Sequence, residues 1–198
     1  MFAILKHVYT SLFRQEQYQL LIIGLDNAGK TTCLEQFRLL FDPNSKPNEN
    51  LPVITPTIGF NLTRFVCDLG DITIWDVGGQ SGLRVIWDKY YSEANGIIYV
   101  VDASDRHRIE EVKAELKAVM GHPDLSDAPV LILANKQDLP DALPPDIIRN
   151  LLDLDEIAVC RAVGVVALNG DGLAQSLQWL LGQLPGSNRA ERLRQMRD

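Results

Sequence analysis

Short apolar runs alternate with amphipathic stretches along most of this chain, which is typical of a parallel sheet whose strands are joined by crossover helices. The runs over residues 96–102 and 129–135 are rich in β-branched side chains and suit strands that are buried on both faces. We therefore expect an α/β fold. The expected strands are residues 18–24, 60–67, 72–76, 96–102, 129–135 and 162–168.

Amphipathic stretches predict helices at residues 30–41, 110–120 and 173–184. A loop rich in proline and asparagine is expected over residues 42–56, and a tight turn at Leu69-Gly70-Asp71. We divide the chain into an N-terminal amphipathic helix at 1–16, a three-layer domain at 17–184, and a polar, arginine-rich tail at 185–198. The domain should have a mostly parallel sheet with helices on both faces. The tail should be a frayed, solvated helix end.

Composition narrows the possible functions. The chain has 198 residues, close to one ordinary domain, and its net charge of −7 without a basic cluster argues against nucleic-acid binding. Its three cysteines are widely spaced, so no disulfide framework is expected and a reducing compartment fits best. No apolar run is long enough for a membrane span, and no signal peptide is expected.

The strongest chemical signal is the segment Gly24-Leu25-Asp26-Asn27-Ala28-Gly29-Lys30-Thr31. It fits the P-loop pattern G-x-x-x-x-G-K-[ST], and it lies where that pattern belongs, between a strand and a helix. Its backbone N–H groups and the start of the helix would surround phosphates, and its lysine would reach the β- and γ-phosphates. The predicted nucleotide-binding residues here are Asp26, Asn27, Ala28, Gly29, Lys30, Thr31 and Thr32.

A P-loop alone does not select the base, so ATPases and kinases remain open at that point. Asn135, Lys136 and Asp138 belong to the segment Asn135-Lys136-Gln137-Asp138, which follows a buried strand at the edge where α/β proteins bind ligands. The Asp138 carboxylate can accept hydrogen bonds from guanine N1–H and N2–H₂, a donor pair that adenine lacks. The combination predicts binding of GTP or GDP.

Two further loops complete the predicted site. In Trp75-Asp76-Val77-Gly78-Gly79-Gln80, Asp76 would hold Mg²⁺, Gly79 would donate its N–H to the γ-phosphate, and Gln80 would orient the attacking water as the catalytic residue. Thr57, in Pro56-Thr57-Ile58-Gly59, would join Thr31 and Asp76 as a metal ligand when the γ-phosphate is present. Two loops that contact one phosphate group make an order–disorder switch.

These blocks together resemble the Ras-like GTPases and, more narrowly, the Arf and Arf-like family, over residues 1–184. Within that family the chain is similar to the Arf-related branch of the Golgi, through Leu34-Glu35-Gln36, the segment at residues 87–91 and the long loop at 42–54. One departure is Val166-Ala167-Leu168, where the family has a Cys/Ser-Ala-Thr/Lys segment that touches guanine. The N–H of Ala167 is still expected to meet the guanine O6.

The resemblance implies a cytoplasmic switch that hydrolyses GTP slowly and recruits effectors reversibly to membranes in vesicle trafficking at the Golgi, with an exchange factor and a GTPase activator as further partners. It also implies an effector surface at Phe60, Trp75 and Tyr90, although an ordinary core position is an equal alternative for Trp75. Other possibilities are a GTP-binding scaffold, a non-trafficking Arf-like regulator and a metabolic nucleotide kinase. A kinase would need an acceptor site and lid arginines, which the sequence lacks.

The first 14 residues place apolar side chains at helical spacing, with Lys6 and Arg14 as the cations and no acid, which suits an anionic membrane surface. A helix packed permanently on the domain is the alternative. Myristoylation needs glycine after the initiator methionine and this chain has Phe2, so no myristoyl group is expected. The Arf-related branch implies instead that an integral-membrane receptor contacts an acetylated Met1.

Overall fold

The computed structural model describes residues 16–42, 45, 57, 59–67 and 70–197 of the chain. Residues 1–15 of the predicted N-terminal helix at 1–16, nearly all of the predicted loop at 42–56 and the first residue of the predicted turn at 69–71 lie outside the described residues. Within the described part, no helix is both long enough and apolar enough to cross a bilayer.

Six strands of the described chain form one sheet, in the order β2-β3-β1-β4-β5-β6. Only the pair β2–β3 is antiparallel; every other neighbouring pair is parallel. The mostly parallel sheet expected from the sequence is therefore confirmed. The strands are β1 (Gln17–Ile23), β2 (Phe60–Cys67), β3 (Gly70–Val77), β4 (Gly96–Asp102), β5 (Val130–Asn135) and β6 (Cys160–Gly164).

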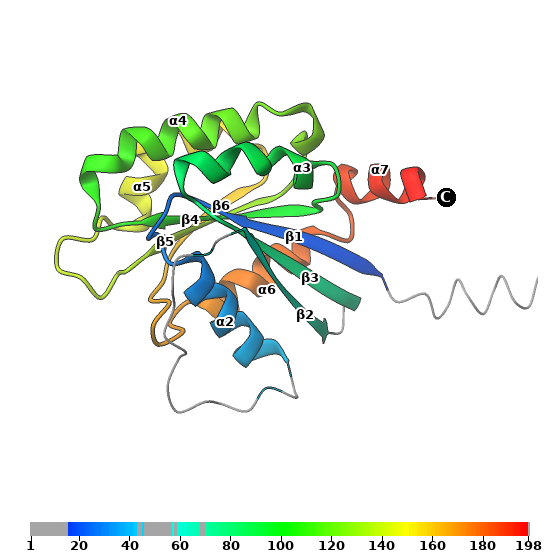
Figure 1. The fold of residues 1–198 in the computed structure, drawn as a ribbon, viewed down its shortest axis with the longest axis horizontal. Helices are drawn as coiled ribbons and strands as arrows, with labels where there is room; N and C mark the ends of the chain where they lie inside the picture. The colour runs from blue at the N-terminus through cyan, green and yellow to red at the C-terminus, as the bar shows by residue number, and fades with distance from the viewer. Residues whose placement is uncertain (1–15, 43–44, 46–56, 58, 68–69, 198) are drawn as a thin grey trace, which may run out of the picture.

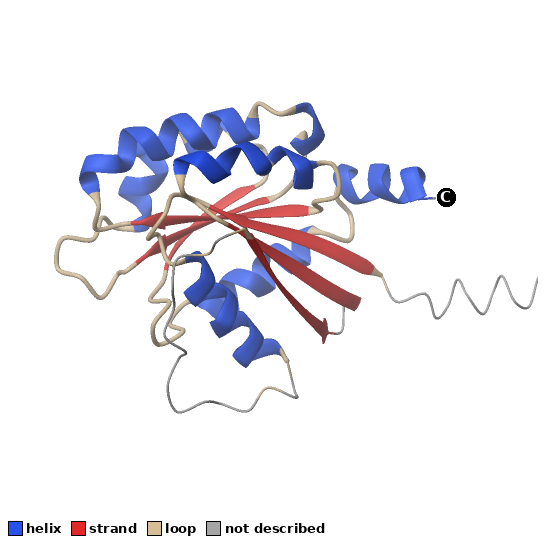
Figure 2. Ribbon diagram, in the orientation of Figure 1, coloured by secondary structure: helices blue, strands red, loops and turns tan. Residues whose placement is uncertain are grey.

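Helices cover both faces of the sheet, which gives the predicted three layers (Figures 1 and 2). On one face lie α2 (Lys30–Phe41) and α6 (Leu173–Gln183); on the other lie α3 (Asp88–Tyr91), α4 (Ile109–Met120) and α5 (Pro145–Leu151). A last helix, α7 (Asn188–Arg197), extends beyond the end of the sheet (Figure 1). Short 3₁₀ turns include residues Ser81–Ile86 and Arg106–Arg108.

Side chains along the central strands point alternately to the two faces of the sheet, and they build one hydrophobic core on each face. In β4, Ile97, Tyr99 and Val101 pack toward α4 and α5, whereas Ile98 and Val100 pack toward α2 and α6. All five side chains are fully buried. A parallel strand with apolar residues at every position needs helices on both sides, and so the apolar runs in the sequence already dictated three layers.

Two differences from the predicted strands change the adjoining loops, whereas the other boundaries agree or shift by one or two residues. The last strand ends at Gly164 rather than at residue 168, because the next amides bond elsewhere: Val166 N–H donates to the Asp171 carbonyl, and Ala167 N–H donates to the Asn135 side chain. At the other site, Gly70 begins β3 and pairs with Cys67 instead of forming the turn. A Cβ at Gly70 would lie 2.0 Å from the Glu16 carbonyl oxygen, so only glycine fits where β3 meets the start of β1.

The C-terminal segment is only in part the solvated tail that was expected: Arg194 and Met196 are exposed, but other residues of α7 are buried. The Arg189 side chain of α7 is buried, and it donates hydrogen bonds to the carbonyl oxygens of Tyr91, Ser92 and Ala94 at the end of α3. Leu193 of α7 is also buried. A composition rich in arginine indicated solvent exposure, but a guanidinium with five donors can be buried where backbone carbonyls converge.

Helix α5 was missed by the sequence analysis. It begins at Pro145 and carries Asp146 in its first turn, and both residues are favourable at the start of a helix. Proline at the first helical position was the signal that could have revealed it. Its Ile148 side chain is fully buried against the sheet.

Candidate functional site

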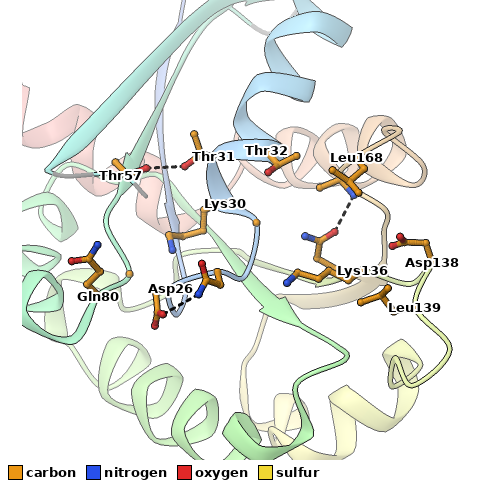
Figure 3. A pocket seen from close by; sticks show the side chains of 15 residues that line it. Asp26, Lys30, Thr31, Thr32, Thr57, Gln80, Lys136, Asp138, Leu139 and Leu168 are labelled. Carbon is orange, nitrogen blue, oxygen red and sulfur yellow. Dashed lines mark hydrogen bonds between the residues drawn. The ribbon is translucent and has the colours of Figure 1, made fainter. Parts of the chain in front are cut away.

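Loops at the carboxyl ends of the parallel strands enclose a cavity of about 440 Å³ (Figure 3). It brings together loops that lie more than a hundred residues apart in the sequence. This is the edge at which open α/β sheets bind ligands. The lining residues are Asp26, Asn27, Gly29, Lys30, Thr31, Thr32, Thr57, Gly79, Gln80, Asn135, Lys136, Asp138, Leu139, Ala167 and Leu168.

The loop between β1 and α2 has a backbone that side chains would obstruct. Gly24 has φ +141°, and a Cβ there would lie 2.2 Å from the Val100 carbonyl oxygen. Gly29 has φ +97° and caps α2, and a Cβ there would lie 2.3 Å from the Asn135 amide nitrogen. The two glycines of the P-loop pattern are therefore required by close approach of β4 and β5, and they leave the loop free to curve around the start of α2.

Asn135 holds the loops together rather than facing the cavity alone. Its buried side-chain amide donates to the Ala28 carbonyl at 2.8 Å, and its side-chain oxygen accepts the Ala167 N–H at 2.9 Å. The sequence analysis placed Asn135 against the nucleotide and the Ala167 N–H on the guanine O6. In the structure that N–H already has a protein partner, so a keto oxygen would have to share it.

Lys30 is a buried cation at the floor of the cavity. Its ammonium donates to the Leu25 carbonyl oxygen at 2.8 Å, and the side chain is almost fully shielded from solvent. Burial lowers the Lys30 pKa to about 8, although the carboxylates of Asp76 and Asp26 oppose the shift. An anionic ligand in the cavity would stabilise the charged form of this lysine.

Thr31, Thr57 and Asp76 converge on one point, as the sequence predicted for a metal site. The Thr31 hydroxyl donates to Asp76 Oδ2 at 2.7 Å, and the hydroxyl oxygens of Thr31 and Thr57 are 2.8 Å apart. Asp76 is fully buried, burial raises its pKa, and its Oδ1 atom has no hydrogen-bond partner among the described residues.

This oxygen cluster fits Mg²⁺. A buried carboxylate oxygen without a partner is unfavourable alone, and a hard cation beside it would compensate. Elsewhere, the described chain has no group of three or more His, Cys, Asp or Glu side chains able to hold a metal ion. One carboxylate and two hydroxyls make the kind of sparse oxygen set that Mg²⁺ shares with phosphates.

The Gly78-Gly79 peptide is oriented by a tryptophan. The buried Trp87 indole N–H donates to the Gly78 carbonyl oxygen at 3.0 Å. Because N–H and C=O point in opposite directions across a trans peptide, the Gly79 N–H is directed away from Trp87. A Cβ at Gly79 would lie 2.4 Å from the Lys30 ammonium nitrogen, so Gly79 lies against the lysine in the wall of the cavity.

Arg84 secures the next peptide, although a single arginine in a polar loop would be expected to face solvent. It donates to the Gly79 carbonyl oxygen at 3.0 Å and forms ion pairs of 2.7 Å with Glu111 and Glu115 of α4. Only 11% of its side chain is exposed, and each of its three guanidinium nitrogens donates to an acceptor of the protein. In this arrangement Arg84 fixes the loop to α4, whereas the predicted catalytic residue Gln80 beside it is exposed at the cavity.

At the other end of the cavity, Lys136 and Asp138 lie together as predicted (Figure 3). Lys136 adopts φ +67° and forms an ion pair with Asp102. Burial alone would raise the pKa of Asp102, but hydrogen bonds from Lys136 and Ser104 outweigh it, and the pKa is lowered. The sequence analysis missed Leu139 and Leu168, which line this end and give it apolar walls suited to a flat base. Their apolar character next to Asp138 and Ala167 was the available signal.

The three aromatic residues predicted as an effector surface lie side by side. The Tyr90 ring centroid is 5.3 Å from that of Trp75 and 6.2 Å from that of Phe60. Phe60 is 58% exposed, while Trp75 and Tyr90 are half-buried, so Trp75 serves both the core and the surface. Leu62, which pairs with Trp75 across β2 and β3, is also exposed and extends the apolar surface; alternation along the strand could have identified it.

The model of the ADP-ribosylation factor family matches residues 5–184. ADP-ribosylation factor-related protein 1 of Rattus norvegicus is 38% identical over 185 residues, covering 91% of this chain and 92% of that protein. ADP-ribosylation factor-like protein 3 of Saccharomyces cerevisiae is 38% identical over 189 residues, covering 93% and 94%.

A solved structure agrees with the fold. The Arl6 BBS3 small GTPase of Trypanosoma brucei, with the bound nucleotide analogue GppNp, superposes with a TM-score of 0.74 at 30% identity. The match covers 90% of this chain and 99% of the other. Relatives with Arf-related and Arf-like names agree with the resemblance drawn from the sequence motifs.

Trp87→Phe should destabilise the protein and loosen the Gly78-Gly79 loop. The ring would still fill the core, but the buried Gly78 carbonyl would lose the indole donor, which costs about 1–3 kcal/mol in the free energy of unfolding. Urea denaturation and hydrogen exchange of the loop amides measure both effects. Trp179→Phe, on α6 away from the cavity, is the control, and equal behaviour of the two variants would contradict the role given to Trp87.

Proposed function

This chain belongs to the ADP-ribosylation factor family of small GTPases, and we propose that it is a switch that binds GTP or GDP with Mg²⁺ and changes its partners with the nucleotide. The observation that carries the proposal is one cavity lined by the buried Lys30, by Asp138, and by Thr31 and Thr57, whose hydroxyls contact the buried Asp76 carboxylate. Each group matches a different part of a guanine nucleotide.

Phosphate binding would rest on Lys30 and on the backbone of residues 26–32. The start of α2 adds partial positive charge at the same point. Thr31, Thr57 and Asp76 would hold Mg²⁺, which neutralises phosphate charge when it is bound. Lys136 would cover the base, and Asp138 would accept its two N–H donors.

Hydrolysis would depend on positioning, since phosphoryl transfer needs little covalent help from the protein. Gln80 would orient the attacking water, and the Gly79 N–H would stabilise charge on the γ-phosphate. Arg84 is bound to Glu111 and Glu115 and is therefore occupied elsewhere. We infer that intrinsic hydrolysis is slow and that a GTPase activator supplies an arginine in trans, which adds about 10³–10⁵ in rate in related systems.

The switch would work through two loops that contact the third phosphate. The Thr57 hydroxyl lies 2.8 Å from that of Thr31 and would be held there when Mg²⁺ is bound, and Gly79 would be held by the phosphate. Thr57 precedes β2 and Gly79 follows β3. Because Phe60, Trp75 and Tyr90 lie on or beside those strands, their surface would change with the nucleotide. Effectors that recognise this surface would thus distinguish GTP from GDP.

We propose that the protein associates reversibly with membranes and that it acts in vesicle trafficking at the Golgi. Support comes from the amphipathic pattern of the first 14 residues and from relatives that carry the Arf-related name. An amphipathic helix without an acyl chain binds membranes weakly, so a second attachment is needed. We propose an integral-membrane receptor that contacts an acetylated Met1.

Asp138→Asn should change base preference from guanine toward xanthine. The amide reverses one donor–acceptor pair, and the mismatch costs about 1–3 kcal/mol, roughly fivefold to more than a hundredfold in affinity. Competition between GDP and xanthosine diphosphate measures the preference. Asp141→Asn, an identical change in the same loop that does not line the cavity, is the control. An unchanged preference for GDP in Asp138→Asn would remove Asp138 from base recognition.

Gln80→Leu should lower GTP hydrolysis while leaving nucleotide affinity nearly intact. Gln80 would act on water in the transition state and make little contact with the ground state. Single-turnover hydrolysis, with and without cell extract as a source of activator, measures the rate, and binding of a non-hydrolysable GTP analogue is the matched reference. If mutant and wild-type rates agree under both conditions, Gln80 has no part in the mechanism.

Binding to membranes should require the GTP state and a membrane protein. Flotation with plain liposomes, with Golgi membranes and with protease-treated Golgi membranes, each with GDP and with a GTP analogue, tests both requirements. We expect strong flotation only with the analogue and untreated Golgi membranes. Binding that is independent of nucleotide would contradict the switch, and equal binding to plain liposomes would contradict the receptor.

A further inference from the structure

Arg108, in the 3₁₀ turn before α4, reaches across to the phosphate-binding loop. One guanidinium nitrogen donates to the Asp26 carboxylate at 3.0 Å and another to the Asp26 backbone carbonyl at 3.0 Å. The third nitrogen donates to Asp105 at 2.7 Å. Two of the three guanidinium nitrogens thus bind one P-loop residue that lies 82 positions away in the sequence.

Asp26 is an unusual neighbour for phosphates because it is an acid. It lines the cavity together with Lys30, Gly79 and Gln80, and Figure 3 shows it on the same side of the cavity as Lys30 and Gln80. Its carboxylate is close enough to act on the Lys30 ammonium. A free carboxylate at this position would repel the terminal phosphate and compete with it for the lysine.

The Arg108 ion pair removes that conflict. It supplies a positive charge directly to Asp26 Oδ1 and draws the carboxylate toward the turn before α4. Asp26 and Arg108 are both partly shielded from solvent, with side chains 41% and 28% exposed, so the compensation is local. Loss of the Arg108 ion pair would weaken the binding of a nucleotide with three phosphates more than of one with two, because the third phosphate would lie next to Gly79 and Gln80.

We propose that Arg108 is a positioning residue that neutralises Asp26 and thereby sets how strongly the pocket favours GTP over GDP. The inference rests on the proposed guanine-nucleotide binding. Arg108 does not itself touch the nucleotide in this scheme; it acts through Asp26. A merely structural alternative exists, since the bond to the Asp26 carbonyl could simply hold the shape of the P-loop.

Removing the acid separates these two explanations. Affinities of full-length wild type, Arg108→Ala, Arg108→Lys and the double variant Asp26→Ala/Arg108→Ala are measured for fluorescent GDP and a fluorescent non-hydrolysable GTP analogue. Arg106→Ala is the matched control, because Arg106 lies in the same turn and carries the same charge but bonds to Asp141 instead. Circular dichroism melting verifies that each variant is folded.

Arg108→Ala should weaken the GTP analogue about tenfold, the usual size for loss of a charged hydrogen bond, and GDP by a smaller factor. Arg108→Lys should retain part of the affinity, Arg106→Ala all of it, and the double variant should recover the GTP-to-GDP ratio of wild type. A double variant as weak as Arg108→Ala would overturn the inference in favour of the structural alternative, as would equal losses for the two nucleotides or Arg108→Ala behaving like Arg106→Ala. Failure of the wild type to bind either nucleotide would overturn the proposed function itself.

Discussion

The amide side chain of Asn135 is the contact on which the rest of the pocket depends. It is buried at the end of β5, and its two hydrogen bonds join the P-loop carbonyl of Ala28 to the N–H of Ala167. Three loops that belong to different crossovers are thereby fixed in one arrangement. The same amide nitrogen would lie 2.3 Å from a Cβ at residue 29, so the glycine of the P-loop and the asparagine of the base loop require each other.

Lys30 and Asp76, two groups of opposite charge, are buried beside these loops, and a ligand can offset the unfavourable desolvation of both. Burial lowers the pKa of Lys30 and raises that of Asp76, so both groups are held where their charged forms are poorly solvated. A phosphate beside the lysine and a cation beside the carboxylate would each restore what burial removed. The pocket thus favours a ligand that brings a phosphate to Lys30 and a cation to Asp76. A nucleotide–Mg²⁺ complex brings both, whereas the nucleotide or the ion alone brings one.

Helix α4 and the turn before it connect the loops on the phosphate side. Glu111 and Glu115 hold Arg84 and, through it, the Gly79 carbonyl, while Arg108 holds Asp26. The Gly79 loop is therefore attached to α4 and the P-loop to the turn before it, and the apolar side of α4 packs on the sheet through Val112 and Leu116. The Arg84 contacts with the Gly79 carbonyl, Glu111 and Glu115 would therefore oppose displacement of Gly79 relative to α4.

The sequence alone determined the layers and most of the site, because both depend on local patterns. Fully apolar runs such as 96–102 required helices on two faces, and the P-loop glycines, Lys30, Thr31, Asp76 and Asp138 were identified by spacing that nucleotide chemistry imposes. What the tertiary structure decided were contacts between distant segments: burial of Arg189 under α3, the ion pairs of Arg84, the grip of Arg108 on Asp26 and the second bond of Asn135. An arginine has the same composition signal whether it is solvated or buried, and only the positions of carbonyls and carboxylates from other elements settle which it is.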